Sequence, residues 1–343
     1  MLEYLTCGYS HSSKNAGILS GFPSGVKVEK KYIEKHLKRR AESPLRGTRQ
    51  KLETDSFEII SGLDYKNFTD GSPIGIILTN TVKTFKREQI IRPGHADLPA
   101  ALKYSIEPWQ ARERASARET AVRTALFCFT MRLLEDLGIK ISSKVISIDA
   151  EKPSVSLIEK LKKSKNSFGG IFEVKAENIP IGLGSHISAE RRLSGKIFSA
   201  LGSLNAVKGV EIGSGFSFAQ KNSSIDEFEN DKGFWKYLSN NSGGINAGIA
   251  NGEPIVLKCA VRPLSGQRES LSSFDFKTRK KAESLSNTSD ISCVYPAAVI
   301  SEFILSYVLA QAIMEKFGGD SFKEISQRVY LWRKKSKKIL RAA

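Results

Sequence analysis

The sequence feature that most limits the possible folds is an apolar repeat at helical spacing within residues 122–137. Apolar side chains that recur every three or four residues lie on one face of a helix. Ser116 and Glu119 precede the repeat at the spacing of a capping box, and Gly138 follows it as a stop signal. We therefore expect a well-defined helix over this segment.

The rest of the chain predicts helices and strands in mixed order. A long apolar helix is expected at 297–317 and a basic helix at 30–40. Strands are expected in three apolar runs, at 72–80, 144–148 and 170–176. The segment 90–110 shows no clear periodicity and is predicted to be a loop. Because the elements do not follow a strict βαβ order, the predicted class is α+β with large antiparallel or mixed sheets.

The charge of the chain indicates an anionic partner. Its 343 residues include 53 Lys and Arg against 36 Asp and Glu, a formal net charge of +17. Basic residues cluster at 27–49, at 112–123 and in a C-terminal tail, which we place at 326–343 after a main domain at 1–325. The tail is interpreted as a solvated helix end or a frayed terminus. The internal clusters are typical of pockets for phosphate and carboxylate groups, although charge alone leaves nucleic acid open as a partner.

Other features of composition narrow the class of protein. No apolar run approaches the roughly 20 residues that span a bilayer, and the first ten residues lack the pattern of a signal peptide. The cysteines (Cys7, Cys128, Cys259 and Cys293) are far apart and form no CxxC pair. This spacing disfavours both a disulfide framework and a structural zinc site. We expect a soluble cytoplasmic protein that neither binds a metal nor enters a membrane.

Two histidines lie in settings that suit acid–base chemistry. His95 follows Arg92, Pro93 and Gly94 in a loop, and a histidine titrates near neutral pH. His11 follows a glycine turn and Ser10, but a serine and a histidine adjacent in sequence rarely face each other. We therefore reject a serine hydrolase. His36 is predicted on a helix surface and His186 in a loop or at a helix start.

A glycine-rich loop at 240–252 lets backbone amides approach a ligand closely. It matches neither the Walker pattern nor the GxGxxG turn of a dinucleotide-binding fold. The residues themselves therefore indicate an enzyme for a small polyanion without naming its reaction.

Taken in order, the motifs resemble those of the chorismate synthase family. The resemblance rests on GYSHS at 8–12, RPGHAD at 92–97, RASARETA at 114–121, NAVKGVEIG at 205–213, the glycine-rich loop, and Ser289-Asp290 followed by Glu302. It covers nearly the whole chain and implies a single β-α-β sandwich domain that assembles as a homotetramer. The implied reaction is the 1,4-anti elimination of phosphate from 5-enolpyruvylshikimate 3-phosphate, with reduced FMN as cofactor, no net redox change and NADPH as a candidate reductant.

The resemblance also assigns roles to residues of this chain. His11 would protonate the departing phosphate, His95 would act as an acid near the flavin, and Asp290 with Ser10 and Ser116 would relay a proton. The implied substrate-binding residues are arginines: Arg40, Arg46, Arg49, Arg92 and Arg118. The implied cofactor-binding residues lie in five segments: Arg114, Ala115, Ser116, Asn205, Ala206, Ala247, Arg262, Ser265 and Thr288. No metal ligand is implied.

The chain also departs from the family pattern, mainly on the cofactor side. Ala247 replaces a glycine, residues 262–266 replace a Lys-Pro stretch, and Thr288 replaces an arginine. Residues 110–113 lack the glycines that usually precede Arg114. The main hypothesis is an active but divergent enzyme. The alternatives are a weakened or inactive paralogue that binds flavin or another anion, and a nucleic-acid-binding module, which lacks a basic motif interleaved with aromatic residues.

Overall fold

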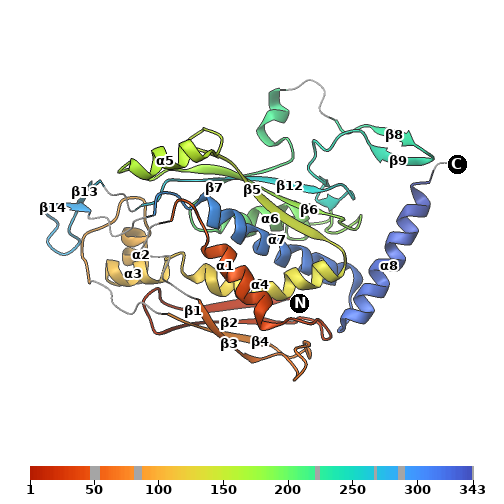
Figure 1. Cartoon of the computed structure of the whole chain (residues 1–343), viewed down its shortest axis with the longest axis horizontal. Helices are drawn as coiled ribbons and strands as arrows, with labels where there is room; N and C mark the ends of the chain where they lie inside the picture. Colours follow the sequence, from red (N-terminus) through yellow and green to blue (C-terminus); the bar gives the residue numbers. More distant parts are fainter. Residues whose placement is uncertain (47–54, 81–86, 221–224, 266–268, 285–289, 342–343) are drawn as a thin grey trace.

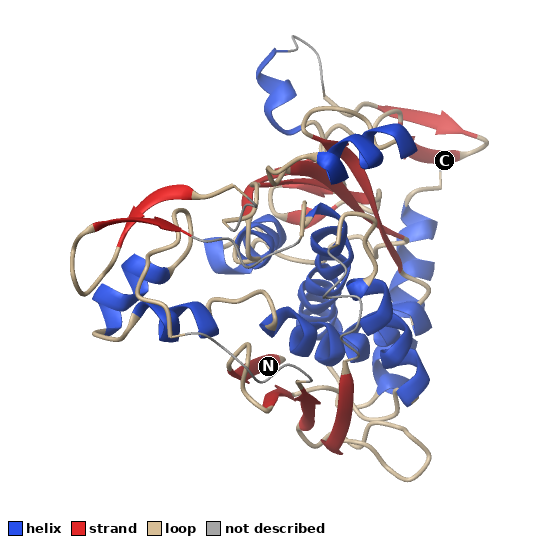
Figure 2. Ribbon diagram, turned by 60° about the vertical axis from the view of Figure 1, so that its left-hand side comes forward, coloured by secondary structure: helices blue, strands red, loops and turns tan. Residues whose placement is uncertain are grey.

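The computed structural model describes residues 1–46, 55–80, 87–220, 225–265, 269–284 and 290–341. The predictions for Arg49 and Thr288 lie outside these residues. The described chain contains two four-stranded antiparallel sheets with helices between them, as Figures 1 and 2 show. This arrangement confirms the predicted α+β class and the β-α-β sandwich.

The first sheet is built from the N-terminal part of the chain. Its strand order is β1-β2-β4-β3. The strands are β1 (Glu3–Gly8), β2 (Lys14–Ser20), β3 (Ser56–Ser61) and β4 (Ile74–Thr79). On β2, Gly17 is necessary for close packing, because a Cβ atom there would lie 2.6 Å from Cγ1 of Val122 on the neighbouring helix. The sheet therefore packs directly on the helical layer.

The second sheet has the order β5-β6-β12-β7. Its strands are β5 (Lys140–Ile148), β6 (Gly170–Glu177), β7 (Val207–Ile212) and β12 (Ile255–Val261). Alternate side chains of β6 and β12 are buried, the pattern of a sheet with one face on a core. The strands predicted at 72–80, 144–148 and 170–176 are confirmed as β4, β5 and β6.

The layer between the sheets holds the most buried helices. They are α1 (Lys30–Ala41), α4 (Glu119–Asp136), α6 (Leu193–Gly202) and α7 (Val294–Phe317). Apolar side chains from these helices and both sheets form one core. By length and composition α7 could cross a membrane, but 78% of its most apolar window is buried inside the protein. We therefore assign α7 to the core of the sandwich.

The remaining elements lie around the sandwich. The helices are α2 (Asp97–Tyr104), α3 (Pro108–Arg114), α5 (Val155–Lys163) and α8 (Phe322–Ile339), with short 3₁₀ turns at Ala189–Arg191 and Gly215–Gln220. The residues that the structure describes also form three two-stranded hairpins: β8 (Phe228–Asp231) with β9 (Phe234–Tyr237), β10 (Ile245–Asn246) with β11 (Ile249–Ala250), and β13 (Leu271–Phe274) with β14 (Lys281–Ser284). Figure 1 places α2, α3 and the β13–β14 hairpin at one end of the molecule and α8 at the other. Position 325, the expected end of the main domain, falls inside α8.

Three local predictions are wrong. The segment 90–110 contains helix α2 and the start of α3, which begins with Pro108 and has a capping box between Glu107 and Gln110. Ser116 and Glu119 do not form a capping box, because the residue at the N-cap of α4 is Arg118 and its side chain makes no capping bond. His36 is only 5% exposed, because its ring packs between Tyr32 and Phe303. His186 lies in an exposed loop, as one of its two predicted settings has it.

Candidate active site

His11 is held by a carboxylate from α3. The residue follows β1 in the turn to β2, and its side chain is 35% exposed. Its backbone N–H donates to Oε2 of Glu113 at 2.8 Å, and its ring Nδ1 lies 2.8 Å from Oε1 of the same carboxylate. Burial raises the pKa of the Glu113 carboxyl, but the hydrogen bonds from His11 outweigh it and the pKa lies below its usual value. Because an ionised carboxylate only accepts hydrogen bonds, Nδ1 carries a proton and Nε2 is left for chemistry.

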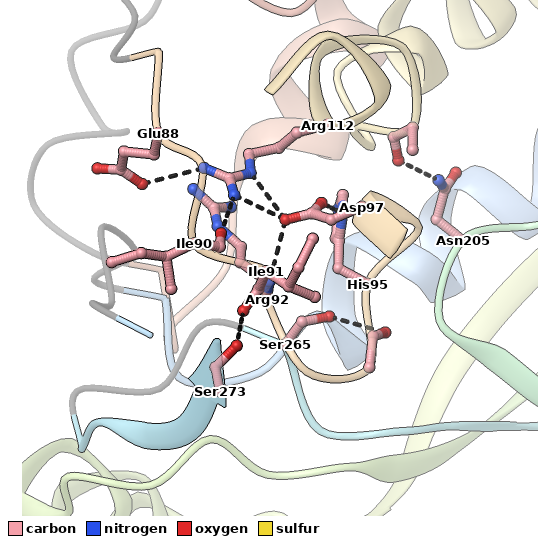
Figure 3. Close-up of polar contacts among 12 residues, drawn as sticks. Glu88, Ile90, Ile91, Arg92, His95, Asp97, Arg112, Asn205, Ser265 and Ser273 are labelled. Atoms are coloured by element: carbon pink, nitrogen blue, oxygen red, sulfur yellow. Dashed lines mark hydrogen bonds and ion pairs between the residues drawn. The ribbon is translucent and has the colours of Figure 1, made fainter. Parts of the chain in front are cut away.

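His95 has the same kind of partner, as Figure 3 shows. Its Nδ1 lies 2.6 Å from Oδ1 of Asp97, whose side chain is fully buried. The Oδ2 atom of Asp97 accepts from Nε and Nη2 of Arg112 at 3.1 and 2.7 Å and from the backbone N–H of Arg92 at 3.1 Å. Burial raises the pKa of the Asp97 carboxyl, but the hydrogen bonds and charges of His95 and Arg112 bring it below its usual value. His95 therefore also has Nε2 as its reactive nitrogen.

Arg92 supplies a cation beside these residues. Burial and the nearby charge of Arg112 lower the pKa of the Arg92 guanidinium from its usual value. Within the described part of the chain, this guanidinium has no hydrogen-bond or ion-pair partner. A half-buried cation without a carboxylate of its own is well suited to an anionic ligand.

The turn between α3 and α4 connects the His11 loop to the segment after α6. The Oγ of Ser116 donates to Oγ of Ser10 at 3.1 Å, and Nδ2 of Asn205 donates to the carbonyl of Ala115 at 3.1 Å. Ser10 therefore faces Ser116 while His11 faces Glu113. This geometry agrees with the rejection of a serine nucleophile activated by its neighbouring histidine.

The segment after β12 closes a circuit of hydrogen bonds around the site. The backbone N–H of Arg262 donates to the carbonyl of Ala206 at 2.9 Å, and its Nη2 donates to Oγ of Ser265 at 2.8 Å. Ser265 in turn donates to the carbonyl of Gly94 at 3.1 Å, next to His95 (Figure 3). These hydrogen bonds thus bring together five segments that are far apart in the sequence, at 10–11, 92–97, 112–116, 205–206 and 262–265.

Three of the predicted substrate arginines have partners within the protein. Arg40 and Arg118 both pair with Asp55, the Arg40 ion pair being 2.9 Å long. Burial raises the pKa of the Asp55 carboxyl, but the two arginines outweigh it and the pKa lies below its usual value. Arg118 also donates to Oδ1 of Asn80 at 2.8 Å, and Asn80 donates to the carbonyl of Ser12 in the His11 loop at 2.6 Å. Arg46 donates to the carbonyl of Ala41 at 2.6 Å.

A cavity of about 500 Å³ opens beside Ser116. It is lined by residues of β1, of the α3–α4 region and of the segment after α6: Tyr4, Leu5, Thr6, Arg114, Ser116, Glu119, Arg123, Ser203 and Asn205. Three of the predicted cofactor residues, Arg114, Ser116 and Asn205, are among them. Arg114 contacts only the carbonyl and hydroxyl oxygens of Thr6, at 3.3 and 3.4 Å, within the described residues. Its charge thus stays unpaired, so the donor set fits a ligand that carries a phosphate.

Two further predicted residues, Ala247 and Asp290, are located by their neighbours in the structure. Ala247 sits in the β10–β11 turn with a φ of +50°, a conformation that favours the glycine usual in the family. The next residue, Gly248, accepts from the backbone of Leu193 at the start of α6, whereas Asn205 follows the other end of that helix. Asp290 is half-buried and precedes Ile291, whose N–H donates to the carbonyl of Leu45, so it lies near the Arg46 segment.

The sequence analysis missed the residues that orient the histidines. Glu113 and Arg112 were noted only as a departure from the glycines of the family, and that departure was the one available signal. Glu119 was assigned to a capping box, but its carboxylate accepts from the hydroxyl of Thr6 at 2.9 Å and from Nε of Arg123 at 3.0 Å.

Comparisons with known proteins identify the family. The family model described as chorismate synthase matches residues 2–314. The chain is 37% identical to the chorismate synthase of Sulfurihydrogenibium sp. (strain YO3AOP1), over 97% of this chain and 98% of the relative. It is 35% identical to that of Aquifex aeolicus (strain VF5), over 95% and 96% of the two chains. A crystal structure of chorismate synthase superposes with a TM-score of 0.80 at 31% identity and covers 98% of both chains. The chain therefore belongs to the chorismate synthase family, the carbon–oxygen lyases of the shikimate pathway.

Proposed function

We propose that the circuit of residues around His11 and His95 is the active site for the elimination reaction of the family. The substrate, 5-enolpyruvylshikimate 3-phosphate, loses phosphate as its allylic C–O bond breaks, and the C6–H bond also breaks. The ring gains a second double bond to give chorismate, and no net oxidation occurs. The observation that carries this proposal is the matched geometry of the two histidines, because each has a carboxylate at Nδ1 and therefore keeps Nε2 for proton transfer.

His11 is the residue we assign to the leaving phosphate. Its ring is partly exposed, whereas the carboxylate of Glu113 that holds it is nearly buried, at 10% exposure. In the imidazolium form of His11, Nδ1–H stays bonded to Glu113 while the proton on Nε2 can pass to a phosphate oxygen as the C–O bond breaks, which lowers the charge on the leaving group. Asn80 connects the Arg40–Asp55–Arg118 cluster to the His11 loop by hydrogen bonds. The cluster carries one net positive charge and so adds positive potential near the loop.

His95 and Arg92 form the other side of the proposed site. The Nε2 of His95 can hold or donate a proton, and the unpaired guanidinium of Arg92 can bind a carboxylate or phosphate oxygen. Asp290, Ser10 and Ser116 are proposed as the relay that removes a proton from the site. The hydrogen bond between the two serines supports this role.

The cavity beside Ser116 is the proposed flavin site. The chemistry that reduced FMN would supply there is electron density for the allylic system during loss of phosphate, with no net oxidation. Arg114 is suited to the flavin phosphate, since its charge has no carboxylate partner within the described residues. Asn205 lines this cavity, and the hydrogen bond from the N–H of Arg262 to the carbonyl of Ala206 holds the adjoining segment in place. The volume of about 500 Å³ is within the range of small-molecule sites.

The working context of the enzyme follows from the family. We propose a cytoplasmic homotetramer, reduced flavin supplied with NADPH as the final reductant, and a small polyanionic substrate. Phosphates and carboxylates of these ligands account for the two internal basic clusters, so these clusters do not require nucleic acid as a partner. The alternative of a weakened paralogue rests on Thr288 and the 262–266 stretch. Arg262 keeps a cation in that stretch, and its ordered contact with Ser265 favours the active enzyme.

The test is anaerobic turnover with chemically reduced FMN, followed by chorismate absorbance. The wild-type protein should form chorismate, and His11→Ala and His95→Ala should each abolish most of the rate. His186→Ala is the matched control, because this histidine lies in an exposed loop and takes part in none of the contacts described for the site, and it should retain the wild-type rate. Absence of product from folded protein at saturating flavin would instead support the inactive paralogue.

A further inference from the structure

We propose that Glu113 is a positioning residue that fixes the tautomer and orientation of His11. This inference rests on the proposed function of His11 as the acid of the reaction. It assigns a role to a residue within 110–113, the run that lacks the glycines of the family pattern.

Glu113 holds the His11 loop at three points. Both carboxylate oxygens are used, one by the backbone N–H of His11 and the other by ring Nδ1, each at 2.8 Å. The backbone carbonyl of Glu113 accepts from the N–H of Ser10 at 3.1 Å. Contacts to both the backbone and the ring of one residue limit the rotation of the side chain, which a contact to the ring alone would not do. These contacts therefore hold the ring of His11 in one orientation, with its Nε2 edge pointing away from Glu113.

The position of Glu113 on α3 explains why it can act on this histidine. Adjacent residues on a helix point about 100° apart, so Arg112 and Glu113 leave α3 in different directions. Arg112 reaches Asp97, which holds His95, and Glu113 reaches His11. One turn of α3 therefore sets the orientation of both histidines. Residues 110–113 can do this because they carry side chains, which glycines at these positions would lack.

The first experiment reads the tautomer directly. Long-range ¹H–¹⁵N NMR spectra of protein labelled at histidine distinguish a proton on Nδ1 from one on Nε2. The His11 signals are assigned by their loss in His11→Ala. In the neutral imidazole, which gives up the Nε2 proton of the imidazolium, we expect the Nδ1–H form in the wild type and a shift toward Nε2–H in Glu113→Ala. An unchanged tautomer in Glu113→Ala would overturn the proposal, and this readout requires neither flavin nor turnover.

The second experiment separates positioning from a general effect on α3. Glu113→Ala should lower kcat about 10- to 100-fold, by analogy with the loss seen when the partner that orients a metal-bound histidine is removed, with little change in KM. Glu113→Asp keeps a shorter carboxylate and should recover part of the rate. In a His11→Ala background, Glu113→Ala should have no further effect, because the residue acts only through His11.

Glu107→Gln is the matched control, since it changes a glutamate at the other end of α3 that contacts no histidine. It should leave both tautomer and kcat unchanged. A loss of rate equal to that of Glu113→Ala would overturn the proposal by showing that any disturbance of α3 suffices. If the tautomer shifts as expected but the wild type forms no chorismate, the proposed function fails while the positioning role stands.

Discussion

Replacing Arg112 with methionine should destabilise the protein in a way that depends on pH. Methionine retains much of the volume of the side chain but removes every donor. Arg112 donates two hydrogen bonds to Asp97, one to Glu88 at 3.0 Å and one to the carbonyl of Ile90 at 3.0 Å. After the change, the fully buried Asp97 would retain only His95 and the backbone N–H of Arg92 as donors. A buried charge would then be left without its main cation.

The expected magnitude follows from the cost of breaking a buried ion pair. Removal of one partner of such a pair costs about 3–5 kcal/mol. With an unfolding entropy of about 2.1 cal/mol/K per residue, that cost corresponds to a fall of roughly 4–7 °C in the Tm of a chain this long. Arg132→Met is the matched control, because it removes a more exposed ion pair with Asp136 and should cost less than about 1 kcal/mol.

The pH dependence gives the sharper test. In the wild type the pKa of Asp97 is depressed, so its contribution to stability is present above the pKa of the unfolded chain and is lost as pH falls through the folded value. In Arg112→Met burial and the hydrogen bond from His95 remain but the donors and charge of Arg112 are lost, so the pKa of Asp97 rises above its wild-type value and protonation stabilises the variant as pH falls. The difference in Tm between variant and wild type should therefore shrink between pH 7 and pH 5, when followed by calorimetry. Equal differences at both pH values would refute this reasoning, as would failure of Asp97→Asn to restore stability in the Arg112→Met background.

Two further predictions concern arginines without a carboxylate partner in the described chain. Arg92→Gln should raise KM for 5-enolpyruvylshikimate 3-phosphate about 10- to 100-fold, the loss expected for a charge-assisted hydrogen bond, with a Tm close to that of the wild type; a large fall in Tm with unchanged KM would contradict a ligand-binding role. Arg333→Ala removes hydrogen bonds of 2.7 and 2.8 Å to the carbonyls of Leu137 and Asn178, so unfolding should become easier by about 1–3 kcal/mol while turnover stays unchanged. A loss of turnover without loss of stability would instead connect α8 to the reaction.

The sequence predicted the parts of the fold that are set by local pattern. The repeat at 122–137 and the apolar segment at 297–317 became α4 and α7, because a helix buried between two sheets needs apolar residues on most of its surface. The segment 90–110 was predicted wrongly because α2 and α3 are short and derive their stability from tertiary contacts. Asp97, at the start of α2, is buried by its bonds to Arg112 and His95, and no periodicity records such bonds. His36 was placed on a surface for a similar reason, since Phe303 lies far away in the sequence.

In the candidate site too, features set by contiguous sequence could be predicted and features set by tertiary contacts could not. The resemblance identified which residue types bind and transfer protons, because those motifs are contiguous in sequence. It did not identify their partners, since Glu113 meets His11 across about a hundred positions and Asp55 meets Arg118 across more than sixty. Partners of this kind depend on how α3, α4 and the first sheet pack. The sequence alone therefore does not show where these partners lie in space.

The arginines of the site differ in what they can offer a ligand, and this difference separates binding from architecture. Arg40 and Arg118 share one carboxylate, that of Asp55, so much of their charge is already engaged in joining α1 and the start of α4 to the edge of the first sheet. Arg92 and Arg114 have no acidic partner within the described residues, and each stands beside a residue of the proposed reaction centre. An anion gains most where a cation has been desolvated without a protein carboxylate to satisfy it. The strongest attraction for phosphate and carboxylate groups is therefore expected at the half-buried Arg92, whereas Arg114 is exposed and offers a solvated charge; the Asp55 cluster instead holds the His11 loop.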